Sequence, residues 1–171
     1  MRAGPLPGYP RMPGLEPRGA VWVSVEIGGR AVQVINTHLG LVPREQQLQA
    51  RSIAGPRWLG NPQRQGPTIL LGDFNMMPNS PEYAVLAGPV GPDYGRLAEQ
   101  GLFADALTLT GVNENAGITY PANGIEQAKR IDHIFVTLEL AGLVRRAWID
   151  EAADASDHQP VFAELDWNGA V

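Results

Sequence analysis

Residues 68–75 read Thr-Ile-Leu-Leu-Gly-Asp-Phe-Asn, and this stretch decides the fold. Its first half, residues 68–71, is a short continuous apolar run, which is typical of a strand covered on both faces, as in α/β proteins. Gly72 interrupts the run, and a polar turn that contains Asp73 and Asn75 follows. Asp and Asn often hydrogen-bond their own backbone in turns, so this stretch alone predicts a strand and a turn but no chemistry.

Upstream of this strand, the sequence predicts a β-hairpin. Residues 21–27 alternate Val or Ile with Trp, Ser and Glu, the period-two pattern of a half-buried strand. Gly28 and Gly29 follow, a pair that tolerates the positive φ angles of a tight turn. A second strand is expected from Arg30 to about Thr37.

The remaining elements interleave a few helices with strands. Pro43 precedes a predicted helix over residues 44–54, and Ser80 is the expected N-cap of a helix that reaches residue 86 or 87. Residues 88–101 are expected to form a loop with one short helix, and residues 102–107 fit either a strand or a helix. Further strands are predicted over residues 130–137, 143–149 and 160–165. The layout is one α/β domain with mostly antiparallel strands and flanking helices.

We divide the chain into three parts by composition. Residues 1–18 are rich in Pro and Gly and are expected to form a flexible lead-in, with neither a helix nor the hydrogen-bonded ladder of a β-sheet. Residues 19–167 form the domain, and residues 168–171 a short tail. Cysteine is absent, which excludes disulfides and thiolate chemistry. No apolar run approaches the roughly 20 residues of a membrane span, and the first residues do not resemble a signal peptide, so a cytoplasmic location is expected.

The net charge of the chain indicates which class of binding partner is disfavoured. The formal net charge is -5, and Lys129 is the sole lysine. Proteins that bind duplexes non-specifically usually present a basic surface, because phosphate neutralisation supplies most of that affinity. The composition therefore disfavours long nucleic acid as a partner.

Polar clusters follow or precede several predicted strands. The chain has three histidines, and two of them close such clusters, Asn36-Thr37-His38 and Ser156-Asp157-His158. Catalytic groups often gather at strand ends, because the sheet fixes them while solvent still reaches them. A lone histidine at such a position can equally be a surface or capping residue.

A further cluster, over residues 130–136, places charge inside a strand. In Arg-Ile-Asp-His-Ile-Phe-Val, residues 130–136, Asp132 shares one face with Ile134, whereas His133 shares the other face with Phe135. The two polar side chains cannot both point into one site from a regular strand, so one serves chemistry and the other packing. Burial of an unpaired carboxylate is costly, which requires a partner for Asp132.

Together these residue types fit one kind of reaction. Asp132 beside His158 would form a carboxylate–imidazole pair that orients the ring and stabilises its protonated form. Asp73 could position or deprotonate water, Asn75 could donate its amide to a phosphoryl oxygen, and His38 could donate from the other side. The chain contains no Gly-x-Ser-x-Gly elbow and no phosphate-cradling Gly-rich loop, which removes the main competing chemistries.

The clusters resemble, in order and spacing, four successive motifs of the endonuclease/exonuclease/phosphatase family. They are Asn36-Thr37-His38-Leu39, Gly72-Asp73-Phe74-Asn75, residues 130–136 and Ser156-Asp157-His158-Gln159-Pro160. The resemblance implies a two-sheet α/β sandwich of the DNase I-like type and a phosphoesterase that depends on a divalent metal, usually Mg²⁺ or else Mn²⁺. Small or lipid-borne phosphoesters are then favoured over long nucleic acid, while the individual substrate stays open.

The resemblance also implies a role for each matched residue. His38 corresponds to a phosphate-contacting histidine, and Asp73 and Asn75 to the pair that orients the nucleophile and the scissile phosphate. Asp132 corresponds to the partner of the final histidine, His158, whose role as base, acid or phosphate clamp stays open. In several members a carboxylate at the position of Asp157 lies next to the metal. The loop over residues 119–129 either lines the pocket or merely connects two elements.

One part of the family pattern has no counterpart here. Members normally begin with a strand that ends in asparagine, then a helix and a strand that leads to a metal-binding glutamate in a Gln-Glu pair. Glu16 lacks the preceding strand and does not match. We therefore expect an incomplete sandwich with an exposed sheet face. The alternative to an active enzyme is an inactive fragment or an incomplete gene model, which would act at most as a binding module.

Overall fold

The computed structural model describes residues 1–8, 14–89, 91, 101–122 and 127–167. Its main sheet has six strands in the order β1-β2-β3-β4-β6-β5, and a second sheet consists of β7 and β8. The main strands are β1 (Arg2–Pro5), β2 (Gly19–Ile27), β3 (Arg30–His38), β4 (Thr68–Asp73), β5 (Ala104–Asp105) and β6 (Asp132–Val136). The second sheet joins β7 (Val144–Ile149) to β8 (Val161–Leu165).

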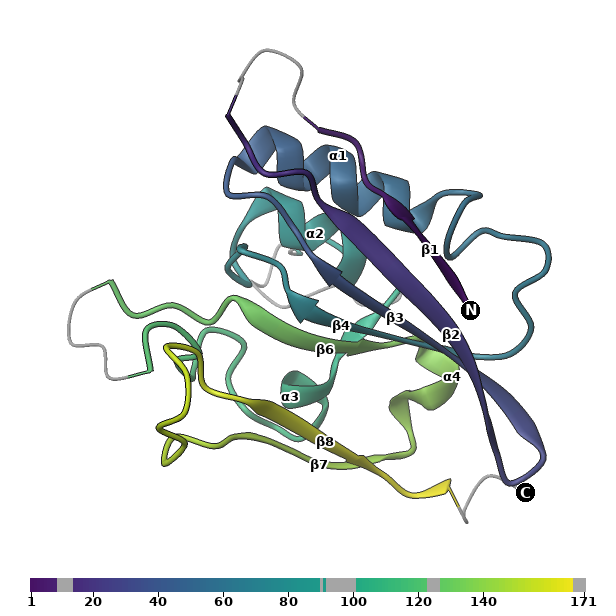
Figure 1. Cartoon of the computed structure of the whole chain (residues 1–171). Coiled ribbons are helices and arrows are strands. Elements are labelled where there is room, and N and C mark those ends of the chain that lie inside the picture. Colours follow the sequence, from purple (N-terminus) through teal and green to yellow (C-terminus); the bar gives the residue numbers. More distant parts are fainter. Residues whose placement is uncertain (9–13, 90, 92–100, 123–126, 168–171) are drawn as a thin grey trace.

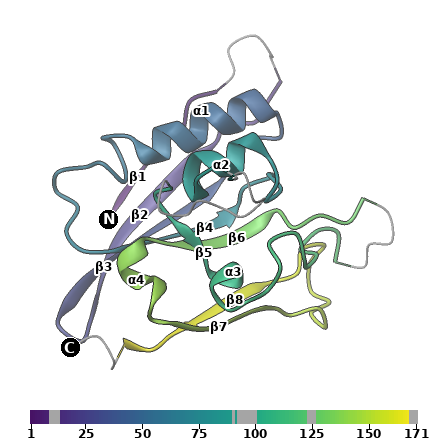
Figure 2. The same cartoon turned by 180° about the vertical axis from the view of Figure 1, so that it is seen from behind.

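The helices and the second sheet lie on opposite faces of the main sheet. The helices α1 (Pro43–Ala54) and α2 (Pro81–Ala87) cover one face, and the β7–β8 hairpin lies across the other (Figure 1). Two short helices, α3 (Ala106–Leu109) and α4 (Leu138–Ala141), lie on the hairpin side, as the reverse view also shows (Figure 2). This is the expected α/β architecture, with mostly antiparallel strands and flanking helices.

The strand register brings the polar clusters to one edge. β3 and β4 are parallel, and α1 makes the crossover that a parallel pair requires. In this register His38 lies opposite Asp73, and Asp73 lies opposite Asp132 of the antiparallel strand β6. Three of the predicted site residues therefore occupy one row across adjacent strands.

Two apolar clusters hold the layers together. The larger one lies between the helices and the main sheet and includes Ile35, Leu70, Phe74, Tyr83 and Phe135, all fully buried. The smaller one consists of Val32, Val136 and Leu140, against which Val144 and Leu165 of the second sheet pack. Side chains of the central strands alternate between the two clusters, because successive residues of a strand point to opposite faces.

The expectation that residues 1–18 form no ladder is wrong for residues 2–5. These residues form β1, which pairs antiparallel with β2 at the edge of the sheet. A proline is tolerated there, because Pro5 is the last residue of a four-residue edge strand and no further strand needs its missing N–H. The next residue, Leu6, is buried and donates its N–H to Arg18 O at 2.8 Å. Residues 9–13 lie outside the described part of the chain.

The ambiguous stretch over residues 102–107 divides between both structures. Ala104 and Asp105 form β5, and the side chain of Asp105 then caps α3 by accepting the Leu107 N–H at 2.9 Å. The short helix expected within residues 88–101 falls mostly outside the described residues. The other predicted strands and helices are present, with bounds that shift by one or two residues.

The hairpin leaves part of the main sheet uncovered. On β2, the residues Val21, Val25 and Ile27 are each 40% exposed, so an apolar stripe faces solvent. None of the helices in the described part of the chain is long and apolar enough to cross a membrane.

Candidate active site

The turn after β4 presents Asp73 and Asn75. Gly72 has a φ of +138°, and a Cβ at this position would lie 1.9 Å from Thr37 O, so only glycine lets β4 approach β3 this closely. One carboxylate oxygen of Asp73, Oδ1, accepts the Asn75 N–H at 2.8 Å. The side-chain amide of Asn75 donates from Nδ2 to Leu39 O at 3.0 Å and lies 3.1 Å from His38 Nε2.

His38 ends β3 and lies beside this turn. Its Nε2 is 3.3 Å from Asp73 Oδ2, and its Nδ1 is 3.1 Å from Arg18 Nη1. A guanidinium only donates hydrogen bonds, so Nδ1 accepts from Arg18. We therefore assign the proton of His38 to Nε2, on the side that faces Asp73.

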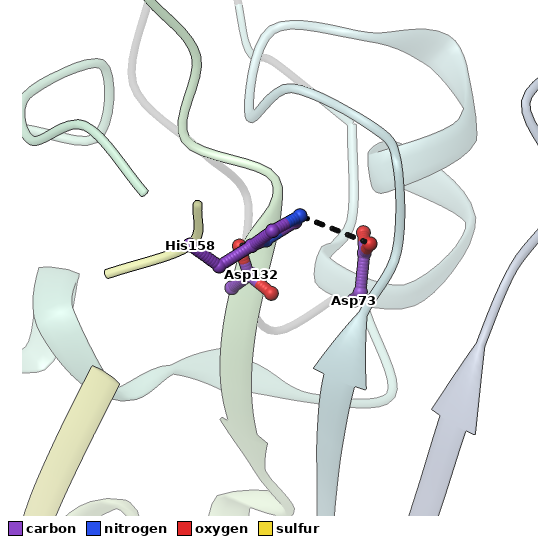
Figure 3. A group of neighbouring side chains, drawn as sticks. All are labelled: Asp73, Asp132 and His158. Atoms are coloured by element: carbon purple, nitrogen blue, oxygen red, sulfur yellow. Dashed lines mark hydrogen bonds and ion pairs between the residues drawn. The ribbon is translucent and has the colours of Figure 1, made fainter. Parts of the chain in front are cut away.

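The closest pair of ionisable side chains in the site is Asp132 and His158. Nδ1 of His158 lies 2.9 Å from Asp132 Oδ2, and Nε2 lies 3.9 Å from Asp73 Oδ2. Figure 3 shows the three side chains converging from the ends of β4 and β6 and from the segment before β8. The Tyr120 ring covers the imidazole, with a centroid separation of 4.8 Å. The partner required for the Asp132 carboxylate is therefore His158.

Thr119 links the two halves of this pair. Its Oγ1 accepts the N–H groups of Ile131 and Asp132 at 2.9 and 3.1 Å, and its carbonyl accepts the Gln159 N–H at 2.8 Å. Thr119 is fully buried, so these bonds are shielded from water. A single residue thus fixes the start of β6 relative to the segment that carries His158.

The charges in the site shift two pKa values. Burial raises the pKa of Asp73, opposed by the bond from Asn75 N–H, and the nearby charge of Asp132 raises it further. Burial alone would lower the pKa of His158. The bond to Asp132 and the charges of Asp132, Asp73 and Asp157 outweigh that effect, so the pKa of His158 is raised. The site is thus an acidic cluster that stabilises a protonated imidazole.

Asp73, Asp132 and His158 also form a group that could hold a cation. One ligand atom from each residue lies within 4.8 Å of the others. The two carboxylates repel each other, and a divalent cation between them would offset that repulsion. Oxygen ligands also suit Mg²⁺ and Mn²⁺. These three residues could therefore supply some of the ligands of a metal site.

The comparison with protein families agrees with these motifs and this fold. The model of the endonuclease/exonuclease/phosphatase family matches residues 3–158. The chain belongs to this family. A comparison with curated proteins gives no match.

Solved structures of several family members share the fold. An endonuclease/exonuclease/phosphatase from Bacteroides vulgatus has a TM-score of 0.67 and 23% identity, over 97% of this chain and 65% of that one. A mannosyl-6-phosphatase from Bacteroides thetaiotaomicron has a TM-score of 0.63 and 23% identity, over 88% of this chain and 58% of that one. TDP2 from D. rerio, solved with a single-strand DNA product, has a TM-score of 0.65 and 17% identity, over 97% of this chain and 67% of that one. The chain thus spans about two thirds or less of the length of these relatives.

The residues that resemble the family's motifs gather around one cleft of about 480 Å³. Its lining includes His38, Asp73, Asn75, Asp157 and His158. Asp132 is absent from this lining, but its carboxylate bonds to His158, which is part of it. Asp157 is exposed and lies outside the three-residue group, so its role as a metal ligand stays a prediction.

Three further polar residues line the same cleft, together with the apolar Leu41 and Ile131. Tyr120 and Lys129 come from the loop whose role the sequence leaves open, and both contribute to the lining. Arg18 also lines the cleft, but sequence reasoning missed it, because an arginine ahead of a strand forms no recognisable pattern. Its side chain is 11% exposed and also pairs with Glu16 at 3.2 Å.

His133 takes no part in the cleft's acidic cluster. It is buried on the opposite face of β6, where its Nε2 lies 3.0 Å from Met76 O and its Nδ1 lies 3.2 Å from Asp105 Oδ2. The alternation of β6 therefore separates Asp132 from His133, as the sequence predicts. In this endonuclease/exonuclease/phosphatase chain, Asp132 is the member that faces His158.

Proposed function

We propose that this chain carries most of the active site of a divalent-metal-dependent phosphoesterase, which hydrolyses its substrate by in-line attack of water. The observation that carries the proposal is the Asp132–His158 pair, 2.9 Å apart, with Asp73 3.9 Å from the other nitrogen of the ring. A carboxylate-oriented imidazole beside a second carboxylate provides a proton donor and a proton acceptor at one place.

The protonation states suggest which role each residue has in the reaction. Asp73 positions the attacking water and takes its proton as oxygen bonds to phosphorus and the bond to the leaving oxygen breaks. The pKa of His158 is raised, chiefly by the bond to Asp132, and the protonated ring that this favours suits a phosphate clamp or a general acid better than a base. His38 Nε2–H and Asn75 Nδ2 donate to phosphoryl oxygens and stabilise the charge that develops there.

Asp73 and Asp132 are the residues that would hold the divalent cation, and Asp157 borders the same cleft. When bound, Mg²⁺ or Mn²⁺ would polarise the phosphoryl oxygens and offset their charge. The carboxylate oxygens of these residues match the ligand preference of both ions.

A small or lipid-borne phosphoester is the substrate class that we favour. Arg18 and Lys129 supply positive charge at the cleft, while the chain as a whole has a net charge of -5. This distribution suits one phosphate group better than a long polyanion. The named relatives, a mannosyl-6-phosphatase and a TDP2 solved with DNA, leave the substrate class of this chain open.

A second candidate function is binding without turnover. The described residues offer two carboxylates to a cation, whereas Mg²⁺ demands near-octahedral oxygen coordination. A chain that spans 65% of the Bacteroides vulgatus relative could then bind a phosphoester without hydrolysing it. This candidate predicts that phosphate binds to the cleft, while no product forms at any metal concentration.

Hydrolysis of bis-p-nitrophenyl phosphate with Mg²⁺ or Mn²⁺ tests the proposal. We expect EDTA to abolish turnover and His158→Ala to lower it by about 100-fold or more, the scale of a lost general acid. Glu164→Gln is the matched control, because this exposed carboxylate pairs with Arg146 on β7, away from the cleft. Turnover that is indifferent to EDTA, or unchanged in His158→Ala, would contradict the proposed mechanism.

A further inference from the structure

We propose that two buried residues outside the cleft, Gln46 and His133, are positioning residues that hold Asn75 in its working conformation. The inference rests on the proposed function, since it assigns a purpose to the exact placement of the Asn75 amide. Neither residue lines the cleft, and each bonds a backbone carbonyl of the turn that follows β4.

The turn is held in an uncommon backbone conformation. Asn75 has a φ of +52°, in the left-handed region that side-chain-bearing residues seldom adopt, although asparagine tolerates it better than most. Such a conformation persists only where the surroundings over-determine it, and it often occurs at functional sites. The contacts that hold Asn75 are therefore of interest.

Gln46 holds the turn from the helix side. It lies on the buried face of α1 and is 3% exposed. Its Nε2 donates one hydrogen bond to Asn75 O at 2.8 Å and another to Gly40 O at 2.9 Å. One side-chain amide thus uses both of its hydrogens to tie the segment after His38 to the turn after Asp73.

His133 holds the turn from the strand side. A carbonyl oxygen only accepts, so the 3.0 Å contact with Met76 O places a proton on His133 Nε2. The other edge of the ring lies 3.2 Å from Asp105 Oδ2 and 3.1 Å from Arg130 Nη1, which pair with each other at 2.7 Å. These three side chains are at most 2% exposed, so the ring has a fixed orientation.

The two contacts act on consecutive carbonyls and come from two different elements. α1 fixes the carbonyl of Asn75, and β6 fixes that of Met76. With the backbone fixed in this way, the Asn75 side chain bonds to Leu39 O and lies against His38 Nε2, inside the cleft. Removal of either contact would let the turn relax and move the amide away from the phosphate position.

The chain offers a matched pair for the test, Gln46→Met and Gln49→Met. Both glutamines lie on the buried face of α1, and each makes two hydrogen bonds to backbone atoms. The bonds of Gln49 go to Gly40 N and Pro7 O, however, and not to the turn. Comparison of the two variants therefore separates positioning of Asn75 from the general loss of a buried amide.

With bis-p-nitrophenyl phosphate, we expect Gln46→Met to lower kcat by about 10- to 100-fold, the effect of a misplacement of about 1 Å. Gln49→Met should stay within about threefold of the parent at a matched thermal stability. In an Asn75→Ala background, Gln46→Met should lower kcat no further, because the group that it positions is gone. Equal losses in the two glutamine variants, or a full further loss in the Asn75→Ala background, would overturn the proposal.

Amide hydrogen exchange gives a readout that needs no turnover. The Asn75 N–H is bonded to Asp73 Oδ1, so its exchange reports whether the turn is closed. Gln46→Met and His133→Phe should each speed exchange at Asn75 by about tenfold or more, whereas Gln49→Met should not. Unchanged exchange at Asn75 in both turn variants would refute the positioning role. Faster exchange in a chain without any turnover would uphold it and would reject the proposed hydrolysis instead.

Discussion

The imidazole of His158 donates from Nδ1 to Asp132 Oδ2 across 2.9 Å, although Asp132 belongs to the main sheet and His158 to the connection within the second one. Asp132 begins β6 of the main sheet, and His158 lies in the connection between β7 and β8. The pair thus joins the two layers of the fold at the cleft and leaves the other ring nitrogen toward Asp73.

Asp132→Asn tests the contribution of this pair. An asparagine keeps the shape of the side chain but removes the negative charge that orients the His158 ring and stabilises its protonated form. We expect kcat to fall by about 10²- to 10⁴-fold, as for other carboxylate–imidazole pairs, while the protein stays folded. Steady-state kinetics with a phosphodiester and circular dichroism on the same sample check both parts. A variant with parental kcat would exclude a role for the pair.

Arg18→Ala should weaken substrate binding. The guanidinium donates to His38 Nδ1, which leaves a proton on Nε2, and it lines the cleft. We expect KM to rise about tenfold, equivalent to about 1.4 kcal/mol, with a smaller change in kcat. Arg146→Ala, on the outer face of β7, is the control that should leave KM unchanged. A similar KM in both variants would argue against contact between Arg18 and the substrate.

Gly72→Ala should destabilise the whole domain. The added methyl group would meet Thr37 O at 1.9 Å, and the φ of +138° is unfavourable for alanine. We expect a loss of more than about 1 kcal/mol in the free energy of unfolding, measured by urea denaturation. Gly142→Ala is the matched control, because its φ is -69° and no atom lies within 4 Å of the added group. Equal stability of the two variants would show that β3 and β4 can separate without cost.

The buried Asp105 gives the protein an acid-sensitive stability. Burial raises its pKa, but the hydrogen bond from His133 and the charges of His133 and Arg130 outweigh this, so the pKa lies far below the ordinary value of 3.8. A lowered pKa contributes stability that is fully present above about pH 4 and is lost as the pH falls through the folded-state value. The difference in unfolding free energy between the parent and Asp105→Asn should therefore be constant above pH 4 and shrink below it. A difference that grows in acid would reverse the assigned sign.

Much of the fold and of the candidate site follows from local patterns. Strand alternation separates Asp132 from His133, and polar clusters at strand ends mark His38, Asp73 and His158 before any coordinates are known. The register of β3, β4 and β6 then brings these clusters together. These features depend on the period of a strand, which a sequence displays directly.

Other features depend on contacts that no period reveals. The buried face of α1 contains Glu45, Gln46 and Gln49, so polarity gives the wrong impression of which side of the helix faces the core. Gln46 and Gln49 are buried because backbone groups of the neighbouring loops satisfy their amides. Likewise, residues 2–5 form a strand because β2 offers a free edge, and not because of their own propensity.

The division of the candidate site between the main sheet and the β7–β8 connection has a consequence for partial unfolding. Asp157 and His158 depend on the β7–β8 hairpin, which the small cluster around Val32 and Val136 attaches to the rest. The other site residues belong to the larger body. Detachment of the hairpin would dismantle the Asp132–His158 pair while the six-stranded sheet stays intact. In a denaturant series, the proposed hydrolytic activity would then be lost at a lower denaturant concentration than the bulk spectroscopic transition, so activity would report how firmly the hairpin is attached.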